Sequence, residues 1–492
     1  MTDLAAFGLF SAFLLAAVLA GEALRAWARW PAESSRRVVH VGVGLASALC
    51  PPLFSSPVPL YAIAAVFIAA NAVAVPRRLL LGMHGIERES WGTVTFPVAF
   101  VVALGLCWTL DASRVFALQV AFLVLALADP AASLVGTRLT SPGRYTVVGQ
   151  TKSLAGSLAF AAVAGITAGI SLAVLRPSWD GLAVVAGAAS VATVGAAVEA
   201  LGRKGGDNLW IVLAGIVPLV RLHEAPEAAG ALLAGVGLAG AFGVLAYRAR
   251  SLDLSGALGA SVLAWMVIAL GGLAWAVPAF TFFVLSSALS RVGRARKAEA
   301  DALAEKGSRR DVGQVVANGG VGAVLLVAYG FAPHPVLYWG FVGAFAAAAA
   351  DTWGTEVGTL ARRPTRLLAV GPRVASGTSG GMSLPGTLAA ALGAAVVVAS
   401  AVLVAPHEWF AGAGAGGLAV VVAVGGLLAA VLDSALGATV QARYRAPDGG
   451  LTERPQSAGT LLPHAAGLRW IDNDRVNLAC TAFGAAWSLA WL

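Results

Sequence analysis

Residues 128–136 read Ala-Asp-Pro-Ala-Ala-Ser-Leu-Val-Gly, and residues 350–358 read Ala-Asp-Thr-Trp-Gly-Thr-Glu-Val-Gly. In both stretches an aspartate, Asp129 or Asp351, ends an apolar run and a glycine follows seven residues later. Each stretch continues through a polar loop into another apolar run. A carboxylate in an apolar segment is costly inside a membrane and usually marks a working site. The repetition indicates two halves of the chain that carry out related chemistry.

The composition is that of an integral membrane protein. Of 492 residues, 58% are hydrophobic and 12% are charged, and the mean hydropathy is +0.81, whereas soluble proteins carry roughly 25% charged residues. Several apolar runs approach the ~20 residues that cross a bilayer, among them residues 4–20, 60–75, 182–201 and 384–404. Residues 1–20 lack a basic leader and are followed by Glu22 and Arg25, so we interpret them as a first span rather than a cleaved signal.

The basic residues gather in alternate loops. The densest cluster lies within residues 291–310, while the intervening loops at 51–57, 276–278, 331–335 and 405–416 contain no Lys or Arg. By the positive-inside rule the basic loops are cytoplasmic and both termini lie outside. The expected location is therefore a cell membrane, as a multi-pass protein of a prokaryotic inner membrane whose sites face the cytoplasm.

The expected fold is all-α, with about sixteen transmembrane helices arranged as two parallel eight-helix repeats. The copies of the motif fall in the fifth and thirteenth expected spans, so both halves share one orientation. We predict one membrane domain over residues 1–225 and a second over 226–492. The run at 209–222 is short and could be re-entrant. Parallel repeats put both sets of acids on the side where nucleotides and Mg²⁺ are found.

The N-terminal half contains acids and a lysine of the kinds that phosphoryl transfer uses. We predict Asp129, Glu199 and Asp207 as Mg²⁺ ligands, because Mg²⁺ takes one or two carboxylates together with substrate phosphates. Asp129 and Lys152 are the catalytic candidates, since phosphoryl transfer needs mainly positioning and charge neutralisation. Small residues before a helix offer backbone N–H groups to phosphate oxygens, and the candidates here are Gly149, Thr151, Ser153 and Gly156.

The C-terminal half has a similar inventory with more glycine. Asp351 and Glu356 are the catalytic candidates, and Asp351, Asp433 and Asp472 are the predicted metal ligands. No lysine matches Lys152, so arginine would have to supply the positive charge. The phosphate candidates are Gly377, Thr378, Ser379, Gly380, Gly381 and Ser383.

Plainer interpretations of these residues stay open. Glycine and serine at helix ends are often caps or close-packing residues, and His40 is undecided between packing and function. The three cysteines and the other histidines show no metal-ligand spacing. No G-x-x-x-x-G-K-[ST] motif is present, which excludes a P-loop.

Two family resemblances cover most of the chain. The N-terminal half resembles the phytol kinase/dolichol kinase family, through residues 36–40, Asp129 to Gly136, Lys152 to Ser157, and Asp207-Asn208. The C-terminal half resembles the DUF92 membrane family, through residues 255–260, 283–297, 310–320, Asp351 with Glu356, and 377–381. That resemblance adds Arg310 and Asn318 to the phosphate-binding candidates.

The resemblances imply two consecutive activities. The first family phosphorylates isoprenoid alcohols, typically with CTP, and the second includes phytyl-phosphate kinase. The expected function is therefore phosphorylation of an isoprenoid alcohol such as phytol, geranylgeraniol or farnesol to its monophosphate and then its diphosphate. Expected partners are the alcohol, its monophosphate, CTP or another nucleoside triphosphate with Mg²⁺, and the membrane, without nucleic acid. A lipid cytidylyltransferase and a transporter with duplicated halves are the alternatives.

Overall fold

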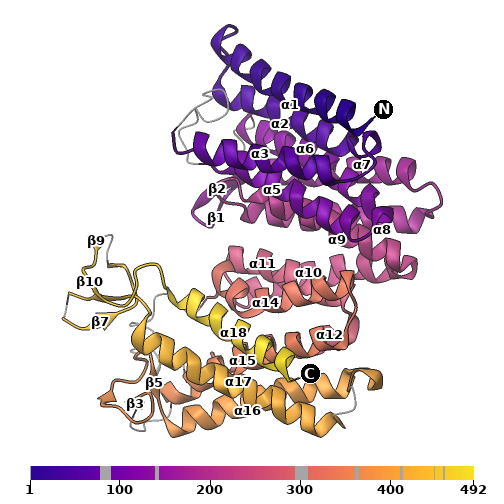
Figure 1. Cartoon of the computed structure of the whole chain (residues 1–492). Coiled ribbons are helices and arrows are strands. Elements are labelled where there is room, and N and C mark those ends of the chain that lie inside the picture. Colours follow the sequence, from indigo (N-terminus) through magenta and orange to yellow (C-terminus); the bar gives the residue numbers. More distant parts are fainter. Residues whose placement is uncertain are drawn as a thin grey trace. The chain divides into compact units, whose positions relative to one another are not determined.

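The structure is a computed structural model that describes residues 2–77, 90–138, 143–293, 309–360, 365–410, 414–447, 449–457 and 460–491. The chain divides into two compact units, unit 1 (Met1–Gly237) and unit 2 (Leu238–Leu492) (Figure 1). The division falls inside one helix, twelve residues beyond the predicted domain boundary. Several residues of the basic loops, including Arg88, Arg296, Lys297 and Arg362, lie outside the described residues.

Unit 1 is built from helices and one short hairpin. The helices are α1 (Asp3–Ala26), α2 (Ala32–Leu49), α3 (Val58–Ala74), α5 (Gly92–Leu104), α6 (Val115–Arg138), α7 (Leu154–Leu175), α8 (Gly181–Leu201), α9 (Asp207–Glu224) and the first part of α10 (Ala229–Arg248). Short 3₁₀ segments are η1 (Pro51–Leu53), η3 (Ala112–Arg114) and η4 (Pro226–Ala228), and η2 (Gly105–Thr109) is a π-helical segment that continues α5. The hairpin pairs β1 (Arg144–Val147) with β2 (Gln150–Ser153).

Unit 2 is also mainly helical and contains more strands than unit 1. Its helices are the rest of α10, α11 (Leu254–Trp265) with η5 (Met266–Leu270), α12 (Gly272–Leu289), α14 (Val312–Phe331), α15 (Pro335–Leu360), α16 (Leu384–Val404), η6 (His407–Phe410), α17 (Gly414–Thr439) and α18 (Asn473–Ala490). Before α16 lie β3 (Thr365–Leu367), β4 (Arg373–Val374) and β5 (Gly381–Met382). Before α18 lie β6 (Arg443–Arg445), β7 (Leu451–Thr452), β8 (Gln456–Ser457), β9 (Thr460–Leu461) and β10 (His464–Ala466).

The chain is mostly helical, as predicted. Within the described residues, ten helices are long and apolar enough to cross a membrane, and two further apolar helices are shorter. Sixteen described helices have at least twelve residues, but sixteen spans in two eight-helix repeats stay a prediction. The all-α expectation needs one correction, because the polar loops before α7, α16 and α18 form small antiparallel strands.

The acid-bearing helix is central in each unit. Helix α6 packs against α2, α7 and α9, and α15 packs against α12, α14, α16, α17 and α18. In α15 the run from Tyr338 to Ala350 is buried throughout. Six alanines and two glycines in that run have small side chains or none, so neighbouring backbones approach closely. Central placement brings Asp129 and Asp351 within reach of side chains from several other helices.

Candidate active sites

Helices α6 and α7 cross at glycines just after Asp129. A Cβ atom at Gly156 would lie 2.9 Å from Ala132 O and 3.4 Å from Gly136 Cα. Ser153 caps α7 and its Oγ accepts a hydrogen bond of 3.0 Å from Gly156 N. Gly156 and Ser153 therefore serve helix packing and capping here, the plainer of the two interpretations.

Unit 2 has the same local arrangement after Asp351. A Cβ atom at Gly386 would lie 2.8 Å from Gly354 O and 3.2 Å from Gly358 Cα, where α15 crosses α16. Ser383 caps α16 and accepts a hydrogen bond of 3.3 Å from Gly386 N. In each unit, therefore, the glycine seven residues after the acid packs against the glycine three residues after the capping serine.

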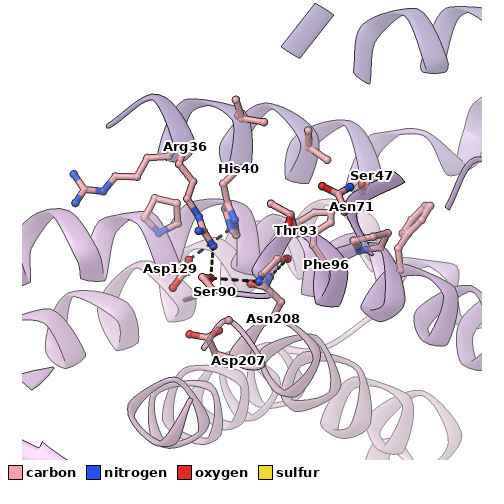
Figure 2. A pocket seen from close by; sticks show the side chains of 18 of the residues that line it. Arg36, His40, Ser47, Asn71, Ser90, Thr93, Phe96, Asp129, Asp207 and Asn208 are labelled. Atoms are coloured by element: carbon pink, nitrogen blue, oxygen red, sulfur yellow. Dashed lines mark hydrogen bonds and ion pairs between the residues drawn. The ribbon is translucent and has the colours of Figure 1, made fainter. Parts of the chain in front are cut away.

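A cavity of about 360 Å³ opens in unit 1 beside Asp129 (Figure 2). Its polar wall combines α2, α5, α6, α9, β2 and the 202–206 loop, and the polar side chains include Arg36, His40, Ser90, Asp129, Lys152, Lys204 and Asp207. The remaining wall is mostly apolar and comes from α1, α2, α3 and α5, with Phe10, Leu14, Val43, Ile63, Phe67, Phe96 and Phe100. One cavity therefore joins a charged end to a hydrocarbon-like end.

His40 and Asp129 face each other across this cavity. His40 Nε2 lies 3.7 Å from Asp129 Oδ2 and 3.1 Å from Leu125 O. A carbonyl oxygen only accepts hydrogen bonds, so the contact with Leu125 requires a proton on Nε2. His40 also packs edge-on against Phe96. Packing and hydrogen bonding together orient the imidazole toward Asp129.

Lys152 is held by Glu199 rather than standing alone. Its Nζ lies 2.5 Å from Glu199 Oε1 and 3.0 Å from Glu199 O. The Glu199 side chain is 9% exposed and does not line the cavity. Glu199 thus positions Lys152, while Asp129, Asp207 and Glu33 face the cavity. Asp129 and Asp207 act electrostatically on each other.

The predicted phosphate loop of unit 1 is a β-hairpin. Gly149 has φ +72° and occupies the turn between β1 and β2, and Thr151 is exposed on β2. Neither residue lines the cavity, to which the hairpin contributes Gln150 and Lys152.

The second cavity, of about 310 Å³, lies in unit 2 and has a more polar lining. It brings together nearly all the predicted site residues of that half: Arg310, Asn318, Asp351, Glu356, Gly377, Thr378, Ser379, Gly380, Gly381, Ser383 and Asp433. Asp472 instead caps α18, where it accepts a hydrogen bond from Arg475 N, and it does not line the cavity.

Acidic groups dominate the second cavity. Asp351, Asp433, Glu356 and Glu453 all line it, and Glu356 accepts a hydrogen bond from Ser290 Oγ. Arg310 faces Asp351 and Glu356. Burial lowers the pKa of Arg310, while the negative charges of Glu356 and Asp351 act in the opposite direction.

The glycines of the second cavity have different surroundings. A Cβ atom at Gly380, which has φ +78°, would lie 2.6 Å from Ala438 Cβ and 2.7 Å from Ser434 O on α17. Gly380 is therefore needed for contact with α17, and a valine there would disturb packing as well as any phosphate. Gly377 has φ +86° and also lines the cavity.

The carboxylates of each cavity are suitable ligands for a divalent cation whose remaining ligands are phosphate oxygens of the substrates. Across the described part of the chain, no group of three or more His, Cys, Asp or Glu side chains is placed to hold a metal ion. Asp129 and Asp207 line one cavity, and Asp351 and Asp433 line the other. Mg²⁺ characteristically uses one or two carboxylates plus phosphate oxygens, and each cavity offers such carboxylates.

Arg36 and Glu453 line the cavities and were not predicted as site residues from the sequence, and His40 stayed undecided. Arg36 and His40 are one helical turn apart and so share a face of α2, a periodicity that could have indicated them. Glu453 follows β7 and accepts a hydrogen bond from Ser379 Oγ. No local pattern indicates Glu453, because its position depends on the fold of residues 443–466.

Comparisons with known proteins identify relatives for large parts of the chain. Protein PGR of Arabidopsis thaliana is 29% identical over 253 residues, which cover 47% of this chain and 85% of that protein. Phytol kinase of Synechocystis sp. is 33% identical over 209 residues, covering 42% of this chain and 87% of the relative. An uncharacterized membrane protein of Methanocaldococcus jannaschii is 31% identical over 150 residues, covering 30% of this chain and 61% of the relative.

No solved structure matches the chain. The model of the family described as integral membrane protein DUF92 matches residues 237–485, nearly the whole of unit 2. Together with the apolar helices, this match establishes the chain as a multi-pass integral membrane protein. The chain belongs to the DUF92 family.

Proposed function

We propose that the chain is a kinase of isoprenoid alcohols, in which unit 1 forms the monophosphate and unit 2 converts it to the diphosphate. The proposal draws on the relative named phytol kinase, 87% of which is covered by this chain. The observation that carries it is the unit 1 cavity, which combines a charged end with an apolar end. A lipid alcohol has the same division, with a hydroxyl at one end and a hydrocarbon chain at the other.

In unit 1 the hydroxyl lies at Asp129 and the isoprenoid chain lies among the apolar residues of α1, α3 and α5. The alcohol oxygen attacks the terminal phosphorus of the nucleoside triphosphate. The new O–P bond forms as the bond from that phosphorus to the bridging oxygen breaks, and a nucleoside diphosphate leaves. The hydroxyl proton passes to Asp129, whose Oδ2 lies 3.7 Å from His40 Nε2.

In unit 2 the acceptor is the lipid monophosphate. One of its phosphate oxygens attacks the terminal phosphorus of a second nucleoside triphosphate, a P–O–P bond forms, and a second nucleoside diphosphate leaves. The acceptor phosphate is already an anion, so no proton has to be removed before it attacks. The obstacle is the repulsion between its negative charge and that of the nucleotide. Arg310 and the 377–381 segment face the cavity where that charge must be neutralised.

Mg²⁺ would be held by Asp129 and Asp207 in unit 1, and by Asp351 and Asp433 in unit 2. When bound, it neutralises charge on the nucleotide phosphates. With both sites on the cytoplasmic side, nucleotide reaches each cavity from the compartment that supplies it.

The test is an assay of the purified full chain with Mg²⁺ and radiolabelled CTP or ATP against phytol, geranylgeraniol and farnesol. We expect labelled monophosphate first, then diphosphate, with one nucleoside diphosphate released per phosphoryl group. Release of pyrophosphate with a nucleotide-linked lipid would identify a cytidylyltransferase instead. Absence of any labelled lipid with all three alcohols and both nucleotides would contradict the proposal.

A further inference from the structure

The described lining of the unit 1 cavity includes the Lys and Arg side chains of Arg36, Arg37, Lys152 and Lys204. Lys152 is neutralised by Glu199 at 2.5 Å. Arg37 donates hydrogen bonds of 2.9 and 3.2 Å to Ser133 Oγ and lies 4.0 Å from Glu33. A nucleoside triphosphate would add several negative charges beside Asp129 and Asp207, and cationic side chains of the cavity must offset them. Arg36 and Lys204 also line this cavity.

The 202–206 loop is fastened to the start of α5 by contacts that only glycine permits. Trp91 N donates to Lys204 O at 2.7 Å, and Thr95 Oγ1 donates to Gly205 O. A Cβ atom at Gly205 would lie 2.9 Å from Ser90 Oγ and would overlap Gly92. The loop backbone and Ser90 therefore occupy one small region of the cavity wall.

Arg36 reaches that region from α2. Its Nη2 donates a hydrogen bond of 2.8 Å to Ser90 Oγ (Figure 2). A Cβ atom at Gly92 would lie 2.6 Å from the same Nη2. The guanidinium and the 202–206 loop thus meet at Ser90 and Gly92, although they come from residues more than 160 positions apart in the chain.

The backbone of the loop is strained at its lysine. Lys204 has φ +50° and is followed by Gly205 at φ +84°. A non-glycine residue in the left-handed region costs roughly 1–3 kcal/mol and is retained where the surroundings hold it there, often at ligand-binding sites. Here the hydrogen bond from Trp91 to Lys204 O helps to fix that conformation beside the cavity.

We infer that the phosphate groups of the nucleotide bind in unit 1 between Arg36 and Lys204, against the wall formed by Ser90, Gly92 and Gly205. This inference rests on the proposed alcohol kinase activity and gives its nucleotide a location. Arg36 supplies a planar fork that matches phosphate oxygens, and Lys204 supplies a point charge from the opposite element. The β1–β2 hairpin then contributes Lys152 to the lipid side of the reaction and is not the main phosphate wall.

The experiment measures the first step alone, as the sum of lipid monophosphate and diphosphate formed from the alcohol. Lys204→Ala and Arg36→Ala should each raise the KM for nucleotide by about tenfold or more, which is the usual effect of losing one charge-assisted hydrogen bond. The KM for the alcohol should change by less than about twofold, because the apolar wall is untouched. Lys204→Arg, which keeps the charge, should recover most of the nucleotide affinity.

The matched control is Arg203→Ala, because Arg203 is the exposed neighbour of Lys204 and does not line the cavity. Its nucleotide KM should stay within about twofold of the parent value. An unchanged nucleotide KM in both Lys204→Ala and Arg36→Ala would overturn the inference. The proposed kinase activity would not be affected by that result.

If the parent chain phosphorylates no alcohol, the proposed function fails and the inference is tested by binding instead. Equilibrium dialysis with labelled CTP and ATP then compares the parent chain with Lys204→Ala and Arg203→Ala. Loss of one bound nucleotide per chain in Lys204→Ala alone would support the inference. Equal binding by all three proteins would overturn it.

Discussion

Lys152 and Glu199 form a buried ion pair whose removal from one side should be costly. Their side chains are 18% and 9% exposed, and an unpaired carboxylate at that depth destabilises a protein by about 3 kcal/mol. We expect Lys152→Met to lower the melting temperature of the detergent-solubilised chain, and Glu199→Gln in the same protein to restore most of it. A double variant no more stable than Lys152→Met would show that the pair does not hold this region together.

Residue type alone indicated Asp129, Asp351 and Asp433, since a carboxylate near an apolar span has few roles other than binding or catalysis. It did not indicate Glu33 or Glu453, which also line the cavities. It did not distinguish Asp207, which lines the cavity, from Glu199, which pairs with Lys152. That distinction depends on which of the two acids contacts Lys152 of the β1–β2 hairpin, and the sequence does not show this. His40 stayed undecided for the same reason, because its contact with Asp129 depends on how α2 packs against α6.

At the level of elements, the α6–α7 crossing should be more sensitive than other positions on the same helix. Gly156→Ala places a methyl group 2.9 Å from Ala132 O, so the helices must separate, at a cost of about 1–3 kcal/mol. Gly169→Ala on the same helix meets only Ala188 Cβ at 3.8 Å and should be neutral or stabilising. Thermal unfolding of both variants checks this, and equal melting temperatures would contradict the close-packed crossing.

The segment before α18 contributes a carboxylate to the second cavity. Glu453 accepts a hydrogen bond from Ser379 Oγ, and its charge acts on Asp351 and Asp433. We expect Glu453→Gln to slow conversion of monophosphate to diphosphate by about tenfold or more, with the first step unchanged. Glu408→Gln, at an exposed position outside the cavity, is the control. Equal second-step rates in the two variants would show that Glu453 does not contribute to the unit 2 reaction.

The helices were predictable and the loops were not, for a physical reason. Apolar runs near ~20 residues predict spans directly. The polar loops form short strands, and which strands pair depends on how each loop packs against the helices of its own unit. The 149–153 loop was expected as a phosphate cradle, and its antiparallel pairing with β1 places Gly149 at a turn away from the cavity. In unit 2 the corresponding loop does line its cavity.

At the scale of the whole molecule, the alternation of basic loops predicts which side each cavity faces. The native cysteines Cys50, Cys107 and Cys480 are all buried, so introduced cysteines can report accessibility. We expect His407→Cys to react with an impermeant thiol reagent added to intact cells, and Val370→Cys to react only after permeabilisation. Both positions are exposed. The reverse pattern would place the cavities on the outer side and contradict the orientation.

The division into two units, each with its own acid-lined cavity, is the whole-molecule feature on which the two-step account depends. The duplicated motif predicted two related sites, and it could not show that their linings differ in polarity. That difference arises from side chains of α1, α3 and α5 in unit 1 and of residues 376–383 and Glu453 in unit 2.

The most direct test compares products from Asp129→Asn and Asp351→Asn in the full chain with labelled nucleotide, alcohol and, separately, synthetic lipid monophosphate. Asp129→Asn should lose alcohol phosphorylation and still convert monophosphate to diphosphate, because unit 2 keeps its own acids. Asp351→Asn should form monophosphate from the alcohol and accumulate it. If either substitution abolished both steps in a protein with the parent melting temperature, the two cavities would not act as separate sites and the account would be contradicted.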